Sequence, residues 1–183
     1  MKFERLSVPD VILVTPDRFG DNRGFFSEVF HQGRYAAAGI DLPFMQDNQS
    51  LSREVGVVRG LHCQVAPYAQ GKLVRCVRGA IWDVAVDARR GSPTYGKWTA
   101  AELSVENWQQ LWIPPGFLHG FCTLLPDSEV LYKVTAGYDR ESERGVAWDD
   151  PDLALPWPVP ASGAVLSDKD RALPRWAASP VLF

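Results

Sequence analysis

Apolar and polar residues alternate in short runs along most of this chain, which is the pattern of β-strands with one buried face. Turn-forming residues separate the runs, for example at 20–22 and 91–93. Strands are therefore predicted over residues 11–14, 25–30, 48–52, 57–61, 72–77, 80–86, 98–103, 110–113, 121–125 and 129–135. Many short strands at this spacing favour a β-sandwich or barrel.

Helix-forming patterns are confined to two short segments, residues 33–39 and 168–173, and Pro174 ends the second. The sequence contains no internal repeat and no linker, and its length of 183 residues fits one domain over 1–183. We therefore expect an all-β domain with short peripheral helices.

Side-chain alternation assigns two polar residues to strand faces that are otherwise apolar. Lys72 shares a face with Val74 and Cys76, and Tyr132 lies among valines on its own strand. A lysine and a tyrosine on inward faces predict a barrel with a polar cavity inside it.

Two further polar residues break this alternation. Strict alternation would place Arg59 and His62 on opposite faces of one strand. Gly60 lies between them, and a β-bulge at this glycine would re-aim one of the two side chains.

Composition limits the classes of partner and the cell compartment that are expected. The net charge is −3 and no Lys/Arg cluster is present, so neither a nucleic acid nor a membrane surface is an expected partner. No apolar run reaches the roughly 18 residues of a membrane span. Cys63, Cys76 and Cys122 lack disulfide or zinc spacing, so we expect reduced thiols and a cytoplasmic protein.

Four residues on or beside the predicted strands are candidates for chemistry, each with a plainer alternative. His62 is a general base or a hydrogen-bonded core histidine. Lys72 on an apolar face requires an anion or transient negative charge, unless it lies on a solvated edge. Tyr132 is an acid or core filler, and His119, after a Pro-Pro-Gly corner, contacts a ligand directly or supports its neighbours.

A second group suits a phosphate and a nucleobase. The guanidinium groups of Arg23 and Arg59 match phosphate geometry, although surface arginines are common. Phe26 and Tyr138 are able to stack on a base, although burial in a core is the commoner fate of aromatic residues.

Eight segments of the chain, taken together, resemble one family. They are Arg23-Gly24-Phe25-Phe26, QDNQS, VVRGLHCQ, QGKLVRCVRG, IPPGFLHGF, LYKVT, ERGVAWDDP and LSDKD. In this order they are similar to the dTDP-4-dehydrorhamnose 3,5-epimerase family, which are nucleotide-sugar epimerases with a cupin (double-stranded β-helix, jelly-roll) fold. The segments cover most of the chain from residue 19 to 170, and eight in register are highly specific.

The resemblance implies a role for each matching residue. His62 would be the base, paired with Asp170, while Tyr132 would donate a proton across the sugar ring and Lys72 would lie by the C4 oxygen. The substrate-binding residues that it implies in this chain's own site are Gln46, Asn48, Arg59, His119, Tyr138 and Glu143. Arg23, Phe26 and Glu28 would reach into the neighbouring subunit of a homodimer.

Asp170 also has a reading that needs no resemblance. The segment from Ser167 to Asp170 matches a capping box at the start of a helix, with the aspartate in its last position. Helix capping and pairing with His62 therefore remain alternative roles for this carboxylate.

The implied reaction needs no redox cofactor, and the residues themselves give no reason to expect a metal. Metal-binding cupins usually carry an HxH pair, but here the second position is Gln64, and the next strand offers Lys72 in place of a carboxylate. Departures from the family at Gln49, Cys63 and Gly137 bear on the fit of the sugar more than on the reaction class.

The implied reaction inverts C3 and C5 of a dTDP-4-keto-6-deoxy sugar through an enolate. Two alternatives remain: an epimerase at one centre or a ketoisomerase of a related sugar, and a non-catalytic sugar-nucleotide-binding cupin. The latter would be expected to lose His62 or Tyr132, and both are present.

Overall fold

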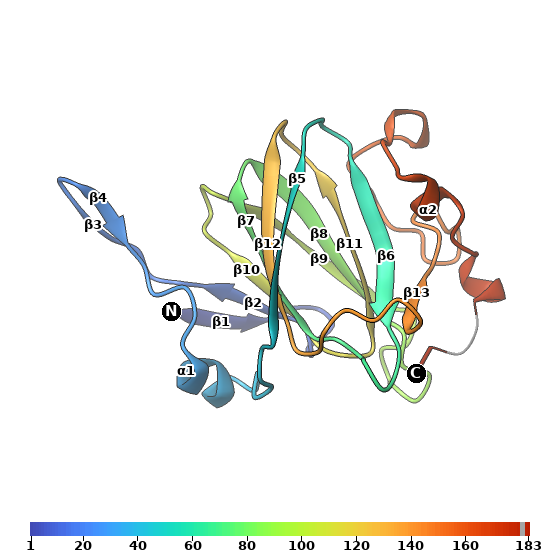
Figure 1. Ribbon diagram of the computed structural model, residues 1–183, viewed down its shortest axis with the longest axis horizontal. Coiled ribbons are helices and arrows are strands. Elements are labelled where there is room, and N and C mark those ends of the chain that lie inside the picture. Colours follow the sequence, from blue (N-terminus) through green and yellow to red (C-terminus); the bar gives the residue numbers. More distant parts are fainter. Residues whose placement is uncertain (180–181) are drawn as a thin grey trace.

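The computed structural model describes residues 1–179 and 182–183, and all strands but two form two antiparallel sheets that face each other (Figure 1). The first sheet has six strands in the order β1-β2-β10-β7-β12-β5. These are β1 (Lys2–Arg5), β2 (Ile12–Thr15), β10 (Gln110–Ile113), β7 (Lys72–Arg78), β12 (Ser128–Val134) and β5 (Gln46–Ser52). The second sheet has five strands, β13 (Glu143–Gly145), β6 (Val58–Gln64), β11 (Phe117–Thr123), β8 (Ala80–Asp87) and β9 (Trp98–Ser104).

The inner faces of both sheets meet in one apolar core. Val74 from β7, Leu111 from β10, Ile81 from β8 and Phe117 from β11 are all buried in it. Val74 and Cys76 lie in this core and Lys72 opens into a pocket beside it, so the predicted face of β7 is confirmed. The all-β architecture of packed sheets expected from the short strands is confirmed as well.

Each outer face is covered by a different segment of the chain. Helix α1 (Gln32–Ala37) brings Tyr35 onto the six-stranded sheet, where it packs near Trp112. The chain after β13 covers the five-stranded sheet, and Trp157 packs edge-on against Trp82 there. This covering segment contains α2 (Asp168–Arg171) and the short 3₁₀ turns η1 (Ala161–Gly163) and η2 (Trp176–Ala178). It therefore brings α2 to the side of β6 (Figure 1).

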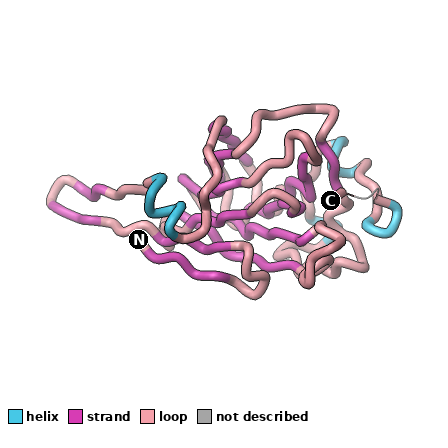
Figure 2. The backbone as a smooth tube through the Cα atoms, turned by 90° about the horizontal axis from the view of Figure 1, so that it is seen from below, coloured by secondary structure: helices cyan, strands magenta, loops and turns pink. Residues whose placement is uncertain are grey.

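A small hairpin leaves the body of the molecule near the N-terminus. It consists of β3 (Phe19–Asp21) and β4 (Gly24–Phe26) and projects away from both sheets (Figures 1 and 2). Phe19 and Phe26 are 62% and 69% exposed on it. In the described part of the chain, no helix is long and apolar enough to span a membrane.

The predicted bulge at Gly60 is confirmed, because the register between β6 and β11 shifts at this point. His62 pairs with His119, whereas Arg59, three positions earlier, pairs with Phe121, only two positions from His119. Gly60 has a φ of +121°, and a Cβ there would lie 2.7 Å from the carbonyl oxygen of His119. The extra residue turns Arg59 and His62 into the same pocket.

Several predicted boundaries were wrong. The strand expected over 25–30 ends at Phe26, because Phe30 turns in to pack on Tyr35 and Phe44. The strand expected over 121–125 runs from Phe117 to Thr123, since glycines at 116 and 120 obscure its alternation. The helix expected to reach residue 173 ends at Arg171. Strands β1, β3 and β13 were not predicted, because three or four residues show too little periodicity.

Candidate active site

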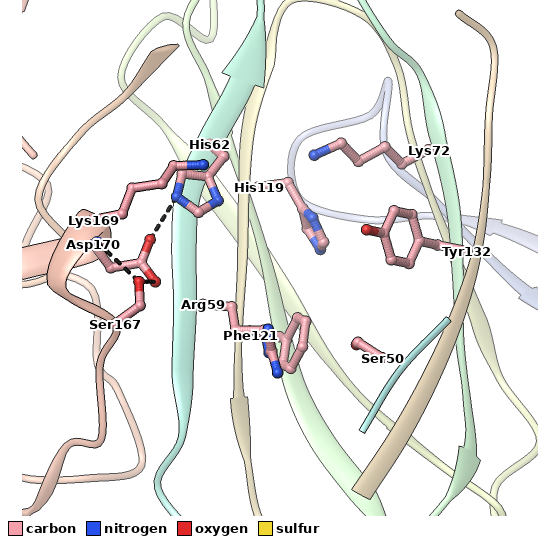
Figure 3. Close-up of a pocket in the computed structure, with 10 residues that line it drawn as sticks. All are labelled: Ser50, Arg59, His62, Lys72, His119, Phe121, Tyr132, Ser167, Lys169 and Asp170. Atoms are coloured by element: carbon pink, nitrogen blue, oxygen red, sulfur yellow. Dashed lines mark hydrogen bonds and ion pairs between the residues drawn. The ribbon is translucent and has the colours of Figure 1, made fainter. Parts of the chain in front are cut away.

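A cavity of about 240 Å³ opens between the two sheets at the end where β6 faces β12 (Figure 3). Its walls carry mostly polar and ionisable side chains. The lining residues are Ser50, Arg59, His62, Lys72, His119, Phe121, Tyr132, Ser167, Lys169 and Asp170. The four residues to which the resemblance assigns the chemistry, His62, Lys72, Tyr132 and Asp170, are therefore brought together from distant parts of the sequence.

His62 contacts Asp170, which α2 carries. The Nε2 atom of His62 lies 2.6 Å from Oδ1 of Asp170, although the contact lacks the angle of a straight hydrogen bond. The side chain of His62 is 23% exposed and that of Asp170 only 6%. Burial alone would raise the pKa of Asp170, but His62, Ser167 and Lys169 together outweigh this effect and hold that pKa below its usual range. The other ring nitrogen of His62 is turned toward the pocket (Figure 3).

The capping role and the pairing role of Asp170 occur together. Ser167 is the N-cap of α2, and its Oγ accepts a hydrogen bond of 3.2 Å from the backbone N–H of Asp170. The same hydroxyl donates a hydrogen bond of 2.8 Å to Oδ2 of Asp170, leaving Oδ1 for His62. The two sequence interpretations were therefore compatible.

A second histidine–carboxylate pair lies deeper in the same site. Nε2 of His119 is 2.9 and 3.1 Å from the two carboxylate oxygens of Asp83, which β8 carries. Both side chains are almost fully buried, and burial lowers the pKa of His119 despite the neighbouring carboxylate. His119 thus lines the pocket, and Asp83 holds its ring in place from the side away from the pocket.

Lys72 extends into the pocket from β7. Burial lowers the pKa of its ammonium group, and the charges of Asp83 and Glu143 oppose this shift only in part. A desolvated cation of this kind gains stability when negative charge develops next to it.

Tyr132 and His62 lie on opposite sides of the cavity, on strands of different sheets (Figure 3). Burial raises the pKa of the Tyr132 hydroxyl, while the positive charge of Arg59 acts in the opposite direction. Arg59 is held across the mouth, because its Nε donates to Ser52 Oγ at 3.2 Å and its Nη2 to the carbonyl of Leu51 at 3.2 Å.

The remaining candidates of this chain's own site form its rim rather than its walls. Glu143 pairs with Lys169 at 2.5 Å and accepts a hydrogen bond of 3.0 Å from the Tyr138 hydroxyl. The backbone N–H of Tyr138 donates to the side chain of Gln46 at 3.1 Å, and Gln46 in turn donates to Asn48 at 2.7 Å. One chain of polar contacts therefore connects α2 with β5 outside the cavity.

Arg23, Phe26 and Glu28 do not reach this pocket. Arg23 pairs with Asp21 within the exposed hairpin, and Glu28 pairs with Arg34 of α1. The role expected for them in a neighbouring subunit stays a prediction.

The sequence interpretation missed four residues that line the cavity: Ser50, Phe121, Ser167 and Lys169. Ser50 lies two positions after Asn48 on β5 and therefore shares its face, so period-two alternation could have found it. Phe121 is part of the buried core cluster, and no sequence signal separates it from an ordinary core residue. Ser167 and Lys169 flank Asp170, but only the fold shows that α2 faces the cavity.

A metal centre has little support in this arrangement. Within residues 1–179 and 182–183, no three His, Cys, Asp or Glu side chains gather as ligands of an ion do. His62 and His119 each already face a carboxylate. The absence of a metal requirement stays a prediction.

Comparison with known proteins identifies the family. The model of the dTDP-4-dehydrorhamnose 3,5-epimerase family matches residues 5–178. A dTDP-4-dehydrorhamnose 3,5-epimerase of Sinorhizobium fredii is 54% identical over 183 residues, covering 100% of this chain and 93% of that protein. The chain belongs to the dTDP-4-dehydrorhamnose 3,5-epimerase family.

Solved structures of the family share the fold described above. The enzyme from Bacillus anthracis, with TDP and PPi bound, superposes with a TM-score of 0.92 at 46% identity, covering 95% of this chain and 98% of that one. A family member from Legionella pneumophila, in complex with dTDP-4-keto-L-rhamnose, has a TM-score of 0.89 at 42% identity, covering 96% and 98%. The expected cupin-type fold and the expected class of isomerases are therefore confirmed.

Proposed function

We propose that this chain epimerises C3 and C5 of dTDP-4-keto-6-deoxyglucose to give dTDP-4-keto-rhamnose. The observation that carries the proposal is the placement of His62 and Tyr132 on opposite sides of one cavity, with Lys72 beside them (Figure 3). Inversion of a carbon centre requires a base on one face of the sugar and an acid on the other.

The reaction follows from the acidity of the substrate. A C4 ketone acidifies the hydrogens on C3 and C5, so His62 removes one of them, and the C–H electron pair moves toward the C4 oxygen. The ammonium of Lys72, which lines the cavity, stabilises the resulting enolate, an electrostatic contribution of about 3–4 kcal/mol for one such donor in other enzymes. Tyr132 then returns a proton to the opposite face, and no redox cofactor takes part.

The rim suits the rest of the substrate. A cavity of about 240 Å³ fits a sugar, whereas the nucleoside diphosphate must extend outward past Arg59 and the exposed ring of Tyr138. We infer that Arg59 meets the diphosphate, that Tyr138 stacks near the thymine, and that Gln46, Asn48, His119 and Glu143 complete the binding set.

Deuterium incorporation tests this function directly. The protein is incubated with dTDP-4-keto-6-deoxyglucose in deuterated water, and the deuterons at C3 and C5 are counted by NMR. Deuterium at both carbons with inversion is expected. Deuterium at one carbon alone would assign a single-centre epimerase, and binding without exchange at either carbon would assign a sugar-nucleotide-binding protein.

A homodimer is part of the proposal. The chain forms one domain over 1–183 whose exposed hairpin, β3–β4, inserts Arg23 and Phe26 with the nearby Glu28 into the partner's site. Support comes from the projection of the hairpin and the exposure of its phenylalanines, since large exposed apolar groups mark interaction sites.

Mixing two inactive variants tests this exchange. A His62→Ala subunit has a defective pocket, and an Arg23→Ala subunit has a defective hairpin. If hairpins are exchanged, each mixed dimer contains one site without either defect, so random mixing restores about a quarter of wild-type activity. No restoration, or an active monomer in light scattering at assay concentration, would contradict the dimer.

We also infer a cytoplasmic location, supported by three cysteines that are buried and free. Fractionation of the source cells, followed by activity assay, tests it. Activity found outside the cytoplasmic fraction would contradict this location.

A further inference from the structure

We propose that Ser167 is a positioning residue for the base: its hydroxyl holds Asp170 in the orientation in which Asp170 holds His62. This inference rests on the proposed function, in which His62 removes the proton from the sugar. It assigns a task to a residue that helix capping alone would otherwise explain.

The contacts form a continuous chain of three residues (Figure 3). Ser167 Oγ donates to Oδ2 of Asp170 at 2.8 Å, and Oδ1 of the same carboxylate lies 2.6 Å from Nε2 of His62. Each oxygen of Asp170 therefore has a separate partner. A carboxylate held at both oxygens cannot rotate about its terminal bond without losing one of them.

The surroundings of Asp170 leave much of this work to Ser167. Helix α2 contains only four residues, too few to be stable without tertiary contacts. The Asp170 side chain is 6% exposed, so few waters are able to replace a lost donor. The hydroxyl of Ser167 also accepts a hydrogen bond from the backbone N–H of Asp170. The same oxygen atom therefore contacts both the backbone and the carboxylate of Asp170.

The consequence for catalysis lies in the tautomer of His62. A fixed carboxylate at Nε2 keeps the proton of the neutral imidazole on that nitrogen, so the nitrogen turned toward the pocket is free to accept the sugar's proton. When Asp170 is free to turn, the proton is shared between the two nitrogens, and the share of molecules that are able to act as a base falls.

Three substitutions separate positioning from capping. Ser167→Thr keeps the hydroxyl for both contacts. Ser167→Gly removes the hydroxyl but remains an acceptable N-cap, whereas Ser167→Ala removes the hydroxyl and is a poor N-cap. Ser162→Ala, at an exposed serine in η1, is the control for mutation nearby. Thermal unfolding of each variant reports capping separately.

The first measurement needs no turnover. With only three histidines in the chain, the ¹⁵N NMR signals of His62 are assignable by comparison with His31→Gln and His119→Gln variants. We expect the Nε2–H tautomer to dominate in the wild type, Ser167→Thr and Ser162→Ala. Ser167→Gly and Ser167→Ala should both show a mixture of the two tautomers.

The second measurement is kinetic. We expect kcat to fall about tenfold in both Ser167→Gly and Ser167→Ala, the size typical of a lost hydrogen bond to a charged group, with KM changed less than about twofold. Ser167→Thr should retain wild-type kcat.

Two outcomes would overturn the inference. If Ser167→Gly behaves as wild type while Ser167→Ala is impaired, the serine only caps the helix. If all three variants keep the wild-type tautomer, Asp170 does not depend on Ser167. A wild-type protein without epimerase activity would instead defeat the proposed function, and the NMR result would still decide the role of Ser167.

Discussion

Two histidine–carboxylate pairs face the same pocket from neighbouring strands, where His62 on β6 lies opposite His119 on β11. His119 meets Asp83 from the next strand of the same sheet, and both side chains are buried. His62 meets Asp170 from a four-residue helix more than 100 positions later in the sequence, and it remains partly exposed. The pairs share their chemistry but differ in burial and in the element that supplies the carboxylate.

This difference separates a buried, fixed ring from the more exposed one to which the proposed function assigns the role of base. Burial lowers the pKa of His119, and the contact with Asp83 holds its ring in place. His62 is partly exposed to the pocket and contacts a carboxylate from a distant segment, which is the arrangement that the proposed base requires. Identical residue types thus acquire different roles from their surroundings.

Removal of the base should have the largest effect. We expect His62→Ala to lower both epimerisation and deuterium incorporation by ~10²–10⁴-fold, the usual contribution of a well-placed acid–base group. His119→Ala is the matched variant of the second pair and should retain more deuterium incorporation than His62→Ala. The check is NMR of the sugar in deuterated water. Equal losses in both variants would erase the distinction between the pairs.

Removal of the opposite-face acid should separate exchange from inversion. Tyr132→Phe keeps the ring and the base but lacks the hydroxyl, so His62 still removes a proton and returns one to the same face. Product formation should fall by about 10²-fold or more, and deuterium incorporation without inversion should fall less. Losses by the same factor would remove Tyr132 from the acid role and leave it as a wall of the cavity.

The buried pair of His119 and Asp83 should affect the pH dependence of the free energy of unfolding more than proton transfer. The pKa of His119 is lowered in the folded state, so as pH falls through about 6.5 the unfolded chain binds more protons than the folded one. The free energy of unfolding is therefore unaffected by His119 above that pH. Below it, the free energy of unfolding decreases by at most about 1.4 kcal/mol per pH unit.

Urea denaturation between pH 5 and pH 8 measures this dependence. His119→Gln should flatten the slope of unfolding free energy against pH, and His31→Gln, at an exposed helix cap, should keep it. An unchanged slope in His119→Gln would show that other groups dominate the acid sensitivity.

Chelation should have the smallest effect. Because each histidine of the site faces a carboxylate rather than a shared metal position, EDTA treatment is expected to leave kcat unchanged. Activity that is lost after chelation and restored by one divalent ion would contradict this prediction and require a new account of both pairs.

Much of the architecture could be predicted from local pattern. Long strands with regular alternation, such as β7 and β12, show their buried face directly, which is why Lys72 and Tyr132 were assigned inward. The bulge could be predicted from Gly60, because only glycine tolerates the close approach of the neighbouring strand. The family motifs then suggested roles for the same residues.

Other features depended on contacts that no local pattern contains. Strand β13 exists because three residues pair with the end of β6, and Phe30 leaves its expected strand because Tyr35 and Phe44 offer it an apolar site. From the sequence, the hydroxyl of Ser167 is predicted only to cap a helix. Its position near His62 depends on the covering segment, which brings α2 against β6.

The sequence by itself determined the alternating strands, the inward lysine and tyrosine and the bulge, because each depends on residues close together in the chain. Only the tertiary structure decided that His119 contacts Asp83. The pairing of His62 with Asp170 was implied by the resemblance, and the structure shows it as a contact. The physical reason is that the environment of a histidine, its burial and the charge next to it, is set by segments that are distant in sequence and adjacent only after folding.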